Sequence, residues 1–392
     1  MLVEQDVTEI TVGTYIVKIT LQTGSFRLTE AEWVKNEVVL NKLIELGIKR
    51  VLVDTEKFDA QMAADAAALG SNILESKQEF NVKMTQAKAL ISTSKNVQRK
   101  IFQHIKEGAE IDLCSVKNLT TELIDTLFTN SDALMCAINI RKKDEYLLEH
   151  SFAVSTLMAL FSRYLGIEKT IIRELAIGAF LHDIGKIRTP DHILHKPGKL
   201  TTDEFGIMKL HVNHSIDIVK SISGISRTSL DIVGLHHEKL NGDGYPYGFA
   251  GQQISRFGRM LSICDIYDAL TADRCYKEGL TQLKSFGILR NLAQSGQLDL
   301  DLVNAFIKCM GVYPVGSLVR LNSNRLAIVE GHNQADPIHP KVNSFYSLDK
   351  RDFEHSNKID LSMVDDEIAQ SVRADDFDLD MEEITRFLVS EA

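Results

Sequence analysis

The stretch Leu181-His182-Asp183-Ile184-Gly185-Lys186 decides how this chain is interpreted, because it sets a histidine, an aspartate and a lysine at the end of an apolar run. On a helix, Asp183 and Lys186 are three residues apart and His182 and Lys186 are four apart, so the three side chains can share one face. Imidazole and carboxylate are ligands for divalent metal ions, whereas an ammonium group beside a cation needs an anion between them. The simplest such anion is a phosphate group. The alternative, from these six residues alone, is a buried His–Asp hydrogen bond beside a surface lysine.

Length and composition indicate an ordinary globular protein with two or three domains. The chain has 392 residues, of which 44% are hydrophobic and 25% are charged, and such a length allows each domain a core of its own. Its five cysteines contain no C-x-x-C pair, so free thiols are expected. The sequence shows neither a signal-peptide pattern nor an apolar stretch long enough to span a membrane. The expected location is therefore the cytoplasm.

The net charge of −10 is concentrated at the end of the chain. Eleven acidic and two basic residues lie between Asp360 and the C-terminus, so this segment holds nine of the ten net negative charges. The body of the protein is nearly neutral and can accept an anionic substrate. The sequence contains no basic run of the kind that would indicate long nucleic acid as a partner. The acidic tail, residues 357–392, is expected to be poorly ordered or to form a partner-binding helix.

The first 140 residues predict a small domain followed by a helical spacer. Residues 1–60 are typical of an α/β unit, with strand patterns over Ile10–Ile19 and Arg50–Asp54 and, between them, a helix that opens at Thr29 and ends at Gly47. Residues 61–140 form the spacer, in which amphipathic helices are expected around 83–107 and 116–140. Their apolar stripes indicate either core or a homodimer interface.

Residues 141–315 show one helical pattern after another, so the fold class is mainly α. Thr201-Thr202-Asp203-Glu204 has the pattern of a capping box that opens a helix. Asn241–Gly248 is a turn-rich loop with three glycines. Residues 316–356 predict a short β extension, with strands over 318–321, 326–329 and 344–348.

Residues that can bind metal gather in the helical part of the chain. Eight of the twelve histidines lie between residues 150 and 265, and most are embedded in apolar helical sequence. Burying so many polar rings is costly without a shared purpose, and a metal centre supplies one. His236 and His237 diverge by about 100° on a regular helix, so they can meet one ion only at a helix end. The candidate ligands are His150, His182, Asp183, His211, His236, His237 and Asp265.

Four motifs in this region together resemble the HD-GYP domain of bacterial signalling proteins, an all-helical bundle within the HD phosphohydrolases. They are His182-Asp183-Ile184-Gly185-Lys186, His236-His237-Glu238, Asp243-Gly244-Tyr245-Pro246 and the run from Asp265 to Lys277. The resemblance extends over about residues 140–315. Residues 1–130 are similar to a small uncharacterised domain that often precedes HD-GYP domains.

The resemblance implies a cyclic di-GMP phosphodiesterase and assigns roles by position. Asp183 would bridge two metal ions held by the seven candidate ligands, and Lys186 would contact the scissile phosphate, which makes these two residues catalytic. The implied substrate contacts are Gly244, Tyr245, Pro246, Asp268, Arg274 and Lys277. Family members with three metals have a glutamate one turn before the first ligand histidine. Here that position is Tyr146, so two metals are predicted.

The physical chemistry agrees with this assignment. Two cations about 3.5–4 Å apart can activate a bridging water and hold the phosphate for in-line attack. Nitrogen-rich ligands with a bridging carboxylate favour iron or manganese, and ligand type does not choose between them. The first hydrolysis would give linear pGpG, and a second would give GMP.

Two other functions stay open from the sequence. One is an HD phosphohydrolase that acts on another cyclic dinucleotide or on a nucleoside phosphate. The other is a catalytically silent dinucleotide receptor, which is disfavoured because none of the seven ligands is missing. The first domain is expected to regulate the second or to mediate homodimerisation.

Overall fold

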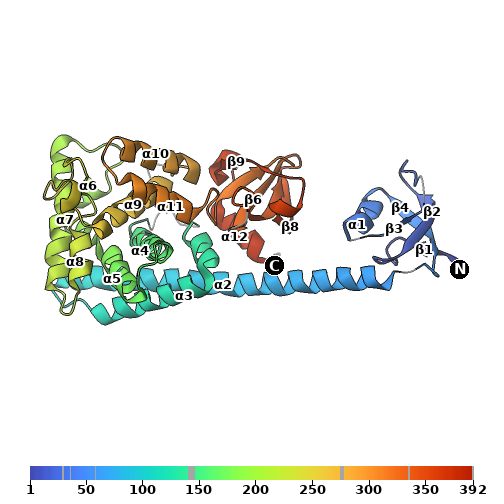
Figure 1. Cartoon of the computed structure of the whole chain (residues 1–392), viewed down its shortest axis with the longest axis horizontal. Coiled ribbons are helices and arrows are strands. Elements are labelled where there is room, and N and C mark those ends of the chain that lie inside the picture. The colour runs from blue at the N-terminus through green and yellow to red at the C-terminus, as the bar shows by residue number, and fades with distance from the viewer. Residues whose placement is uncertain are drawn as a thin grey trace. The chain divides into compact units, whose positions relative to one another are not determined.

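The computed structural model describes residues 1–390 apart from 29–30, 36, 58, 140–145, 274–277 and 334–335. Its internal contacts divide the chain into two compact units, Met1–Phe80 and Asn81–Ala392. The second unit combines a helical body with a small sheet (Figure 1). The mainly helical fold class predicted from the sequence is confirmed.

Within its described residues, the first unit holds a four-stranded antiparallel sheet in the order β1-β4-β2-β3. Alternate residues of the predicted last strand, Val51 and Val53, are buried in its core, as expected when one face of a sheet is covered. Its elements are β1 (Leu2–Asp6), β2 (Tyr15–Gln22), β3 (Glu32–Trp33), α1 (Glu37–Glu45) and β4 (Ile48–Asp54).

The predicted start of the helix in this unit is wrong. Thr29 lies outside the described residues, and α1 begins only at Glu37. Trp33 instead belongs to β3, where it pairs with Tyr15 across the sheet, and the two ring centroids lie 4.9 Å apart. Such an aromatic cross-strand pair stabilises a strand. A contact between residues distant in sequence therefore overrides the local helical pattern.

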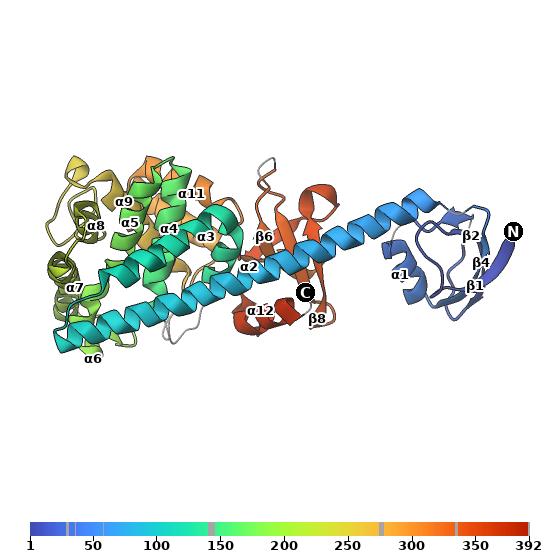
Figure 2. The same cartoon turned by 90° about the horizontal axis from the view of Figure 1, so that it is seen from below.

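The helical body begins on α2 (Ala60–Glu107), a single helix that starts where the predicted spacer starts and continues into the second unit. The C-terminal half of α2 runs beside α3 (Leu113–Asn139) in both views (Figures 1 and 2). The remaining helical elements are α4 (Tyr146–Tyr164), α5 (Lys169–Leu181), η2 (Ile184–Arg188), α6 (Asp191–Leu194), α7 (Thr202–Ser221), α8 (Arg227–Val233), η3 (Gly251–Gln253), α9 (Arg256–Thr271), α10 (Gln282–Gln294) and α11 (Leu300–Met310).

Helix α4 is central to the body, because it packs against α3, α5, α9 and α11. Its Phe161 ring lies edge-on to that of Phe306 of α11, with 5.3 Å between the ring centroids. The Phe306 ring in turn lies edge-on to that of Tyr267 of α9, with 5.2 Å between the centroids. All three side chains are buried, and such aromatic contacts stabilise a core beyond the area they bury. Among the described residues, no helix combines the length and the apolar character that crossing a membrane requires.

The predicted capping box at the start of α7 is confirmed. The Thr201 hydroxyl accepts a hydrogen bond from the Glu204 backbone N–H at 3.3 Å, and the Glu204 carboxylate accepts one from the Thr201 N–H at 2.7 Å. These bonds satisfy donors that a helix start otherwise leaves unpaired. They fix the start of the helix that carries His211.

In the part of the chain that the structure describes, the C-terminal segment forms a five-stranded antiparallel sheet in the order β8-β7-β6-β5-β9. The three predicted strands all lie in it. Its elements are β5 (Leu318–Leu321), β6 (Arg325–Gly331), β7 (Lys341–Ser347), β8 (Asp352–Asp360), η4 (Leu361–Met363), β9 (Ile368–Val372), η5 (Ala374–Phe377) and α12 (Met381–Ser390).

The expectation that residues 357–392 form a poorly ordered or partner-binding tail is wrong. Strand β9 pairs with β5 inside the sheet, and Val372 and Ile384 are buried in the core of this domain. Arg373 binds the Asp273 carboxylate of the helical body at 2.5 Å. The apolar side chains point inward while many of the acidic ones stay exposed, so the high charge is compatible with a folded segment.

Helix α12 provides a test of this packing. Ile384→Ala removes a fully buried side chain and is expected to destabilise the C-terminal sheet by about 2–5 kcal/mol. The measurement is hydrogen exchange of β9 at several denaturant concentrations. The matched control is Glu383→Ala, an exposed neighbour that should leave the exchange of β9 unchanged. Equal exchange in both variants would show that α12 does not support the sheet.

Candidate metal centre

The His182–Lys186 motif lies where a helix changes its geometry. Helix α5 ends at Leu181, His182 caps it, and Asp183 precedes the 3-10 turn η2, so the motif is not one continuous helix. The Lys186 ammonium contacts the Asp183 carboxylate three residues before it. The anion beside Lys186 in this structure is therefore Asp183 itself. Both Asp183 and His182 are buried, whereas the Lys186 side chain remains 19% exposed.

Gly185 allows this turn to lie directly against α7. A Cβ atom at Gly185 would lie 2.1 Å from the His211 carbonyl oxygen and 2.4 Å from the Ser215 nitrogen. The Gly185 N–H donates a hydrogen bond to the Ser215 hydroxyl at 2.8 Å. Only glycine permits this approach of two backbones. It brings His211 next to Asp183.

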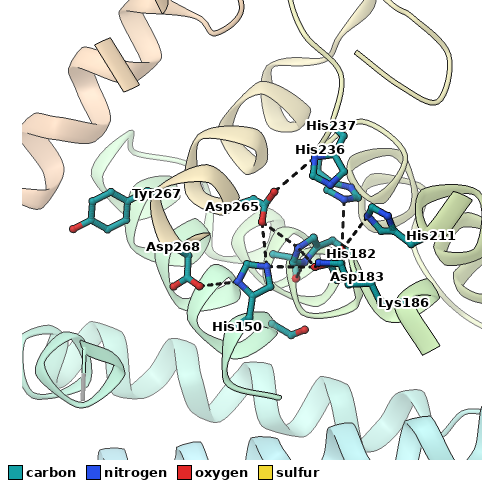
Figure 3. A network of polar contacts seen from close by, with 12 residues as sticks. His150, His182, Asp183, Lys186, His211, His236, His237, Asp265, Tyr267 and Asp268 are labelled. Atoms are coloured by element: carbon teal, nitrogen blue, oxygen red, sulfur yellow. Dashed lines mark hydrogen bonds and ion pairs between the residues drawn. The ribbon is translucent and has the colours of Figure 1, made fainter. Parts of the chain in front are cut away.

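The structure brings all seven predicted ligands together from separate elements (Figure 3). His150 comes from α4, His182 and Asp183 from the end of α5, His211 from α7 and Asp265 from α9. His236 and His237 lie in the turn after α8, as the requirement for a helix end predicts. Among the described residues, the ligand atoms form two groups that could each hold an ion, Asp183 with His211, His236 and His237, and His150 with His182 and Asp265.

Asp183 connects these two groups through its two carboxylate oxygens. Its Oδ1 lies 3.2 Å from His211 Nε2 and 3.8 Å from His236 Nε2. Its Oδ2 lies 3.3 Å from His150 Nε2 and 3.4 Å from His182 Nε2. One oxygen therefore faces each group, which is the arrangement of a bridging carboxylate.

Asp265 has a similar position on the other side of the cluster. Its Oδ1 lies 3.1 Å from His150 Nε2 and 3.7 Å from His182 Nε2. Its Oδ2 lies 3.9 Å from His237 Nδ1. Two carboxylates thus lie among five imidazoles, and all seven groups converge on the same small volume (Figure 3).

Three of the histidines are oriented by their own backbone. Nδ1 of His182, His211 and His236 lies 2.6–2.7 Å from the carbonyl oxygen three residues earlier. Because a carbonyl only accepts, each Nδ1 carries a proton, and Nε2 presents a lone pair whenever the ring is neutral. These buried Nε2 atoms and Asp183 Oδ1 have no hydrogen-bond partner among the described residues. Unsatisfied buried acceptors are costly unless a cation binds them, so this donor set fits metal ions.

His150 is oriented by a side chain instead. Its Nδ1 lies 2.7 Å from Oδ2 of Asp268, one turn after Asp265 in α9. Asp268 is fully buried. Its carboxylate supports a candidate ligand histidine from inside the protein, and the predicted contact of Asp268 with the dinucleotide stays a prediction. A carboxylate behind a ligand histidine fixes its tautomer and raises its basicity.

The carboxylates of the cluster are held in their ionised form. Burial by itself raises the pKa of the Asp183 carboxyl, but Lys186 and His182 outweigh burial and hold that pKa well below its usual range. Burial acts on Asp265 in the same way, and hydrogen bonds from His150 and His182 hold its pKa well below the usual range. Both groups can therefore act as anionic ligands.

The imidazoles do not share one protonation state. Burial and the neighbouring rings hold the pKa of His236 well below its usual value. Burial also lowers the pKa of His237 to about 3, so both rings are neutral, as metal binding requires. Burial lowers the pKa of His182 too, but Asp183 and Asp265 outweigh it and raise that pKa to about 9. The two carboxylates thus attract a positive charge to the centre of the cluster.

The Gly244-Tyr245-Pro246 loop lies against the cluster. The Tyr245 ring centroid is 4.7 Å from that of His237, and the Tyr245 N–H donates to the His237 carbonyl at 3.2 Å. A Cβ atom at Gly244 would lie 2.4–2.7 Å from the backbone of Glu238 and Lys239. Gly244 is therefore needed for close packing within the protein. Any contact that it or Pro246 makes with a substrate stays a prediction.

Glu238 holds this loop, a role that its position in the sequence does not reveal by itself. The buried carboxylate accepts hydrogen bonds from the backbone N–H groups of Tyr247, at 2.7 Å, and Phe249, at 3.0 Å. Its position directly after the His236–His237 pair was the available signal. An acidic residue next to a ligand pair and close to a glycine-rich loop can tie the two together.

The remaining predicted site residues are not placed by the structure. Arg274 and Lys277 lie outside the described residues. Their contact with the dinucleotide stays a prediction. His214, three residues after His211, belongs to neither ligand group among the described residues.

Family models match the chain in two separate parts. A family model described as HD domain matches residues 134–302, and one described as a domain of unknown function matches residues 2–116. The first match contains all seven clustered residues. The second ends within α3 and includes all of α2.

Curated relatives extend this similarity. Cyclic di-GMP phosphodiesterase PA4108 of Pseudomonas aeruginosa is 34% identical over 317 residues, which cover 79% of this chain and 76% of that protein. The 3'3'-cGAMP-specific phosphodiesterase 1 of Vibrio cholerae is 32% identical over 178 residues, or 45% of this chain and 41% of that protein. A cyclic di-GMP phosphodiesterase of Thermotoga maritima is 32% identical over 216 residues, or 55% of each chain.

The role of Asp268 can be tested directly. Asp268→Asn should weaken Mn²⁺ binding by about 10–100-fold, because it removes the carboxylate that orients His150. The measurement is calorimetric titration of the metal-free full chain with Mn²⁺. Asp301→Asn, at an exposed position in α11, serves as the control. A variant with normal Mn²⁺ affinity but a raised KM would favour the substrate contact that the sequence predicts.

Proposed function

The chain belongs to the HD-GYP family of cyclic di-GMP phosphodiesterases, and we propose that it hydrolyses cyclic di-GMP with divalent metal ions held by the seven clustered residues. The observation that carries this proposal is the placement of Asp183, whose two carboxylate oxygens face two different groups of imidazole nitrogens. A bridging carboxylate of this kind is typical of sites that hold two cations.

The number of metal ions is inferred from the ligand groups. Each group offers at least three ligand atoms, and Asp183 is shared between them. A third ion would need a further carboxylate near His150. The nearby Glu149 is buried and paired with Lys95 at 2.5 Å, which supports two ions. Five imidazoles and two carboxylates favour iron or manganese over magnesium or calcium.

The reaction is the addition of water across one phosphodiester bond. The phosphorus atom gains the hydroxyl of the water and the departing ribose oxygen gains a proton, which gives linear pGpG and, after a second round, GMP. Bound metal ions would lower the pKa of the attacking water and neutralise the phosphate. Asp183 and Asp265 would hold these cations, and the five imidazoles would complete their coordination.

Lys186 is the residue proposed to contact the substrate phosphate. Its ammonium group reaches the Asp183 carboxylate and keeps part of its side chain in contact with solvent. From this position Nζ can donate hydrogen bonds to a phosphate oxygen while Asp183 binds the cations. A fixed positive charge that meets the charge developing on the phosphate stabilises the transition state.

Tyr245 is proposed to line the substrate pocket. Its ring lies tilted beside that of His237, and Lys209 of α7 lies 5.6 Å from the ring centroid. An aromatic face and a cation at the edge of the centre suit a nucleobase with its phosphate. Arg274 and Lys277 are proposed to contact the second half of the dinucleotide.

The similarity to a 3'3'-cGAMP-specific enzyme makes another cyclic dinucleotide the alternative substrate. The deciding experiment uses the full chain, purified without oxygen. Metal per chain is measured, and cyclic di-GMP and 3'3'-cGAMP are then offered separately with chromatography of the products. We expect about two metal ions per chain and faster conversion of cyclic di-GMP to pGpG. Faster cleavage of 3'3'-cGAMP would establish the alternative, and cleavage of neither would contradict the proposed function.

Asp183→Asn tests the bridging carboxylate. Asparagine keeps the volume but loses the negative charge that both ligand groups share, so metal content and hydrolysis should fall together. The expected loss of activity is at least about 100-fold. Metal analysis and product chromatography on the same preparation measure both effects. Asp191→Asn, at an exposed position in α6, should behave as the unaltered protein, and full activity in Asp183→Asn would refute the assignment.

Lys186→Met separates phosphate binding from metal binding. Methionine keeps the apolar stem but cannot donate to a phosphate, so turnover should fall by about 10²–10³ with metal content unchanged. Steady-state kinetics and metal analysis provide the two values. The control is Lys199→Met, at an exposed position in the loop that precedes α7. Loss of metal from Lys186→Met would instead indicate a structural role for this lysine.

A further inference from the structure

Two buried contacts join α2 to the helix that carries His150. Lys95 Nζ of α2 lies 2.5 Å from Glu149 Oε1 of α4, and their side chains are only 13% and 5% exposed. Three residues along α2, the Gln98 amide donates to the Ser151 hydroxyl at 2.9 Å. Lys95 and Gln98 share one face of α2 because residues three apart on a helix are neighbours. Glu149 and Ser151 are the residues immediately before and after His150.

The positions of these contacts around α4 determine where His150 points. Successive residues of a helix are rotated by about 100°, so Glu149 and Ser151 lie about 200° apart with His150 between them. A partner that holds both therefore lies on the side of α4 opposite His150. Two such contacts prevent α4 from rotating about its axis. They direct His150 away from α2 and toward Asp183 and Asp265, which its Nε2 approaches at 3.3 Å and 3.1 Å (Figure 3).

The same face of α2 is buried well beyond these two residues. The buried side chains are Met84, Ala87, Leu90, Ser94, Gln98 and Ile101. This stripe repeats every three or four residues, as a helix packed along its length requires. The part of α2 after residue 80 thus belongs to the compact unit that contains the metal centre. Yet Lys95 and Gln98 fall within the match to a domain of unknown function, whereas His150 falls within the HD-domain match.

We propose that Lys95 and Gln98 are positioning residues for the metal ligand His150, so that α2 completes the catalytic apparatus from outside the HD domain. The inference rests on the proposed function for the identity of the metal centre. A buried ion pair fixes geometry more than it adds stability. Here it sets the rotation of α4, while Asp268 sets the tautomer of the His150 ring. Any movement of α2 along or about its axis would therefore change the metal centre.

The test compares charge variants of the pair in the full chain, with Mn²⁺ alone as the probe. Lys95→Glu sets two carboxylates against each other and is expected to weaken Mn²⁺ binding by about 10-fold or more. The double variant Lys95→Glu/Glu149→Lys restores the pair and should recover most of the affinity. Lys95→Arg, which keeps the charge, should lose less than Lys95→Met. In the metal-loaded proteins kcat should fall in the same order, with KM for cyclic di-GMP unchanged.

Controls separate positioning from general destabilisation. Lys100→Glu introduces the same charge change on the exposed face of α2 and should leave Mn²⁺ binding unaltered. In the metal-free protein, hydrogen exchange of α4 should be faster in Lys95→Glu than in the unaltered chain. In the double variant it should return to the rate of the unaltered chain. If Lys95→Glu does not fold, Lys95→Met and Lys95→Arg supply the same comparison. Normal Mn²⁺ affinity in Lys95→Met, or no recovery in the double variant, would overturn the inference.

These readouts also distinguish this inference from the proposed function. A full chain that binds Mn²⁺ but cleaves neither cyclic dinucleotide would contradict the function and leave the positioning role intact. A chain that cleaves cyclic di-GMP with Mn²⁺ affinity insensitive to residue 95 would contradict the positioning role alone.

Discussion

The buried carboxylate of Asp183 is the constraint on which the rest of the structure depends. An ionised carboxyl group with almost no solvent contact is stable only if positive charge or hydrogen-bond donors surround it. Here the surroundings are Lys186 and four imidazole nitrogens at 3.2–3.8 Å. In their neutral forms, three of those histidines present buried lone pairs rather than protons, so they cannot then satisfy the carboxylate by themselves. Divalent cations resolve this conflict, because the same ion satisfies the carboxylate and the lone pairs together.

The surrounding structure orients each candidate ligand through direct contacts, and the kind of contact differs from one ligand to the next. His182, His211 and His236 are each oriented by a hydrogen bond from Nδ1 to the backbone carbonyl three residues earlier, so no second side chain is needed. His150 has a carboxylate behind it in Asp268, and its helix is fixed by contacts with α2. Gly185 lets the 3-10 turn approach α7 at a distance that any side chain would prevent. Seven candidate ligands from five segments of the chain thus reach one volume, which is the preorganisation that catalysis by metal ions requires.

Segments on both sides of the HD-domain match belong to the same folded unit. Helix α2 contacts α4 beside His150, and the C-terminal sheet binds the helical body through Arg373 and Asp273. The acidic C-terminal segment is therefore part of a packed domain, with its apolar residues inside and its charge at the surface. These contacts give the flanking segments a physical route to the centre, since the contacted residues lie in α4 and just after α9, and these two helices carry His150 and Asp265. Regulation by the first unit, homodimerisation and the cytoplasmic location stay predictions.

The sequence by itself determined the ligand types, the helical class and the motif order, because these follow from residue chemistry and from spacing within one element. It also predicted the capping box of α7 and the helix end at His236 and His237, where all interacting groups are near neighbours in the chain. Tertiary structure alone decided that Asp268 supports His150, that Trp33 joins a strand and that β9 completes a sheet. The ion pair between Lys95 and Glu149 is likewise visible only in the tertiary structure. Each of these contacts joins residues far apart in sequence, and the free energy that selects such a partner comes from burial, which local patterns do not contain.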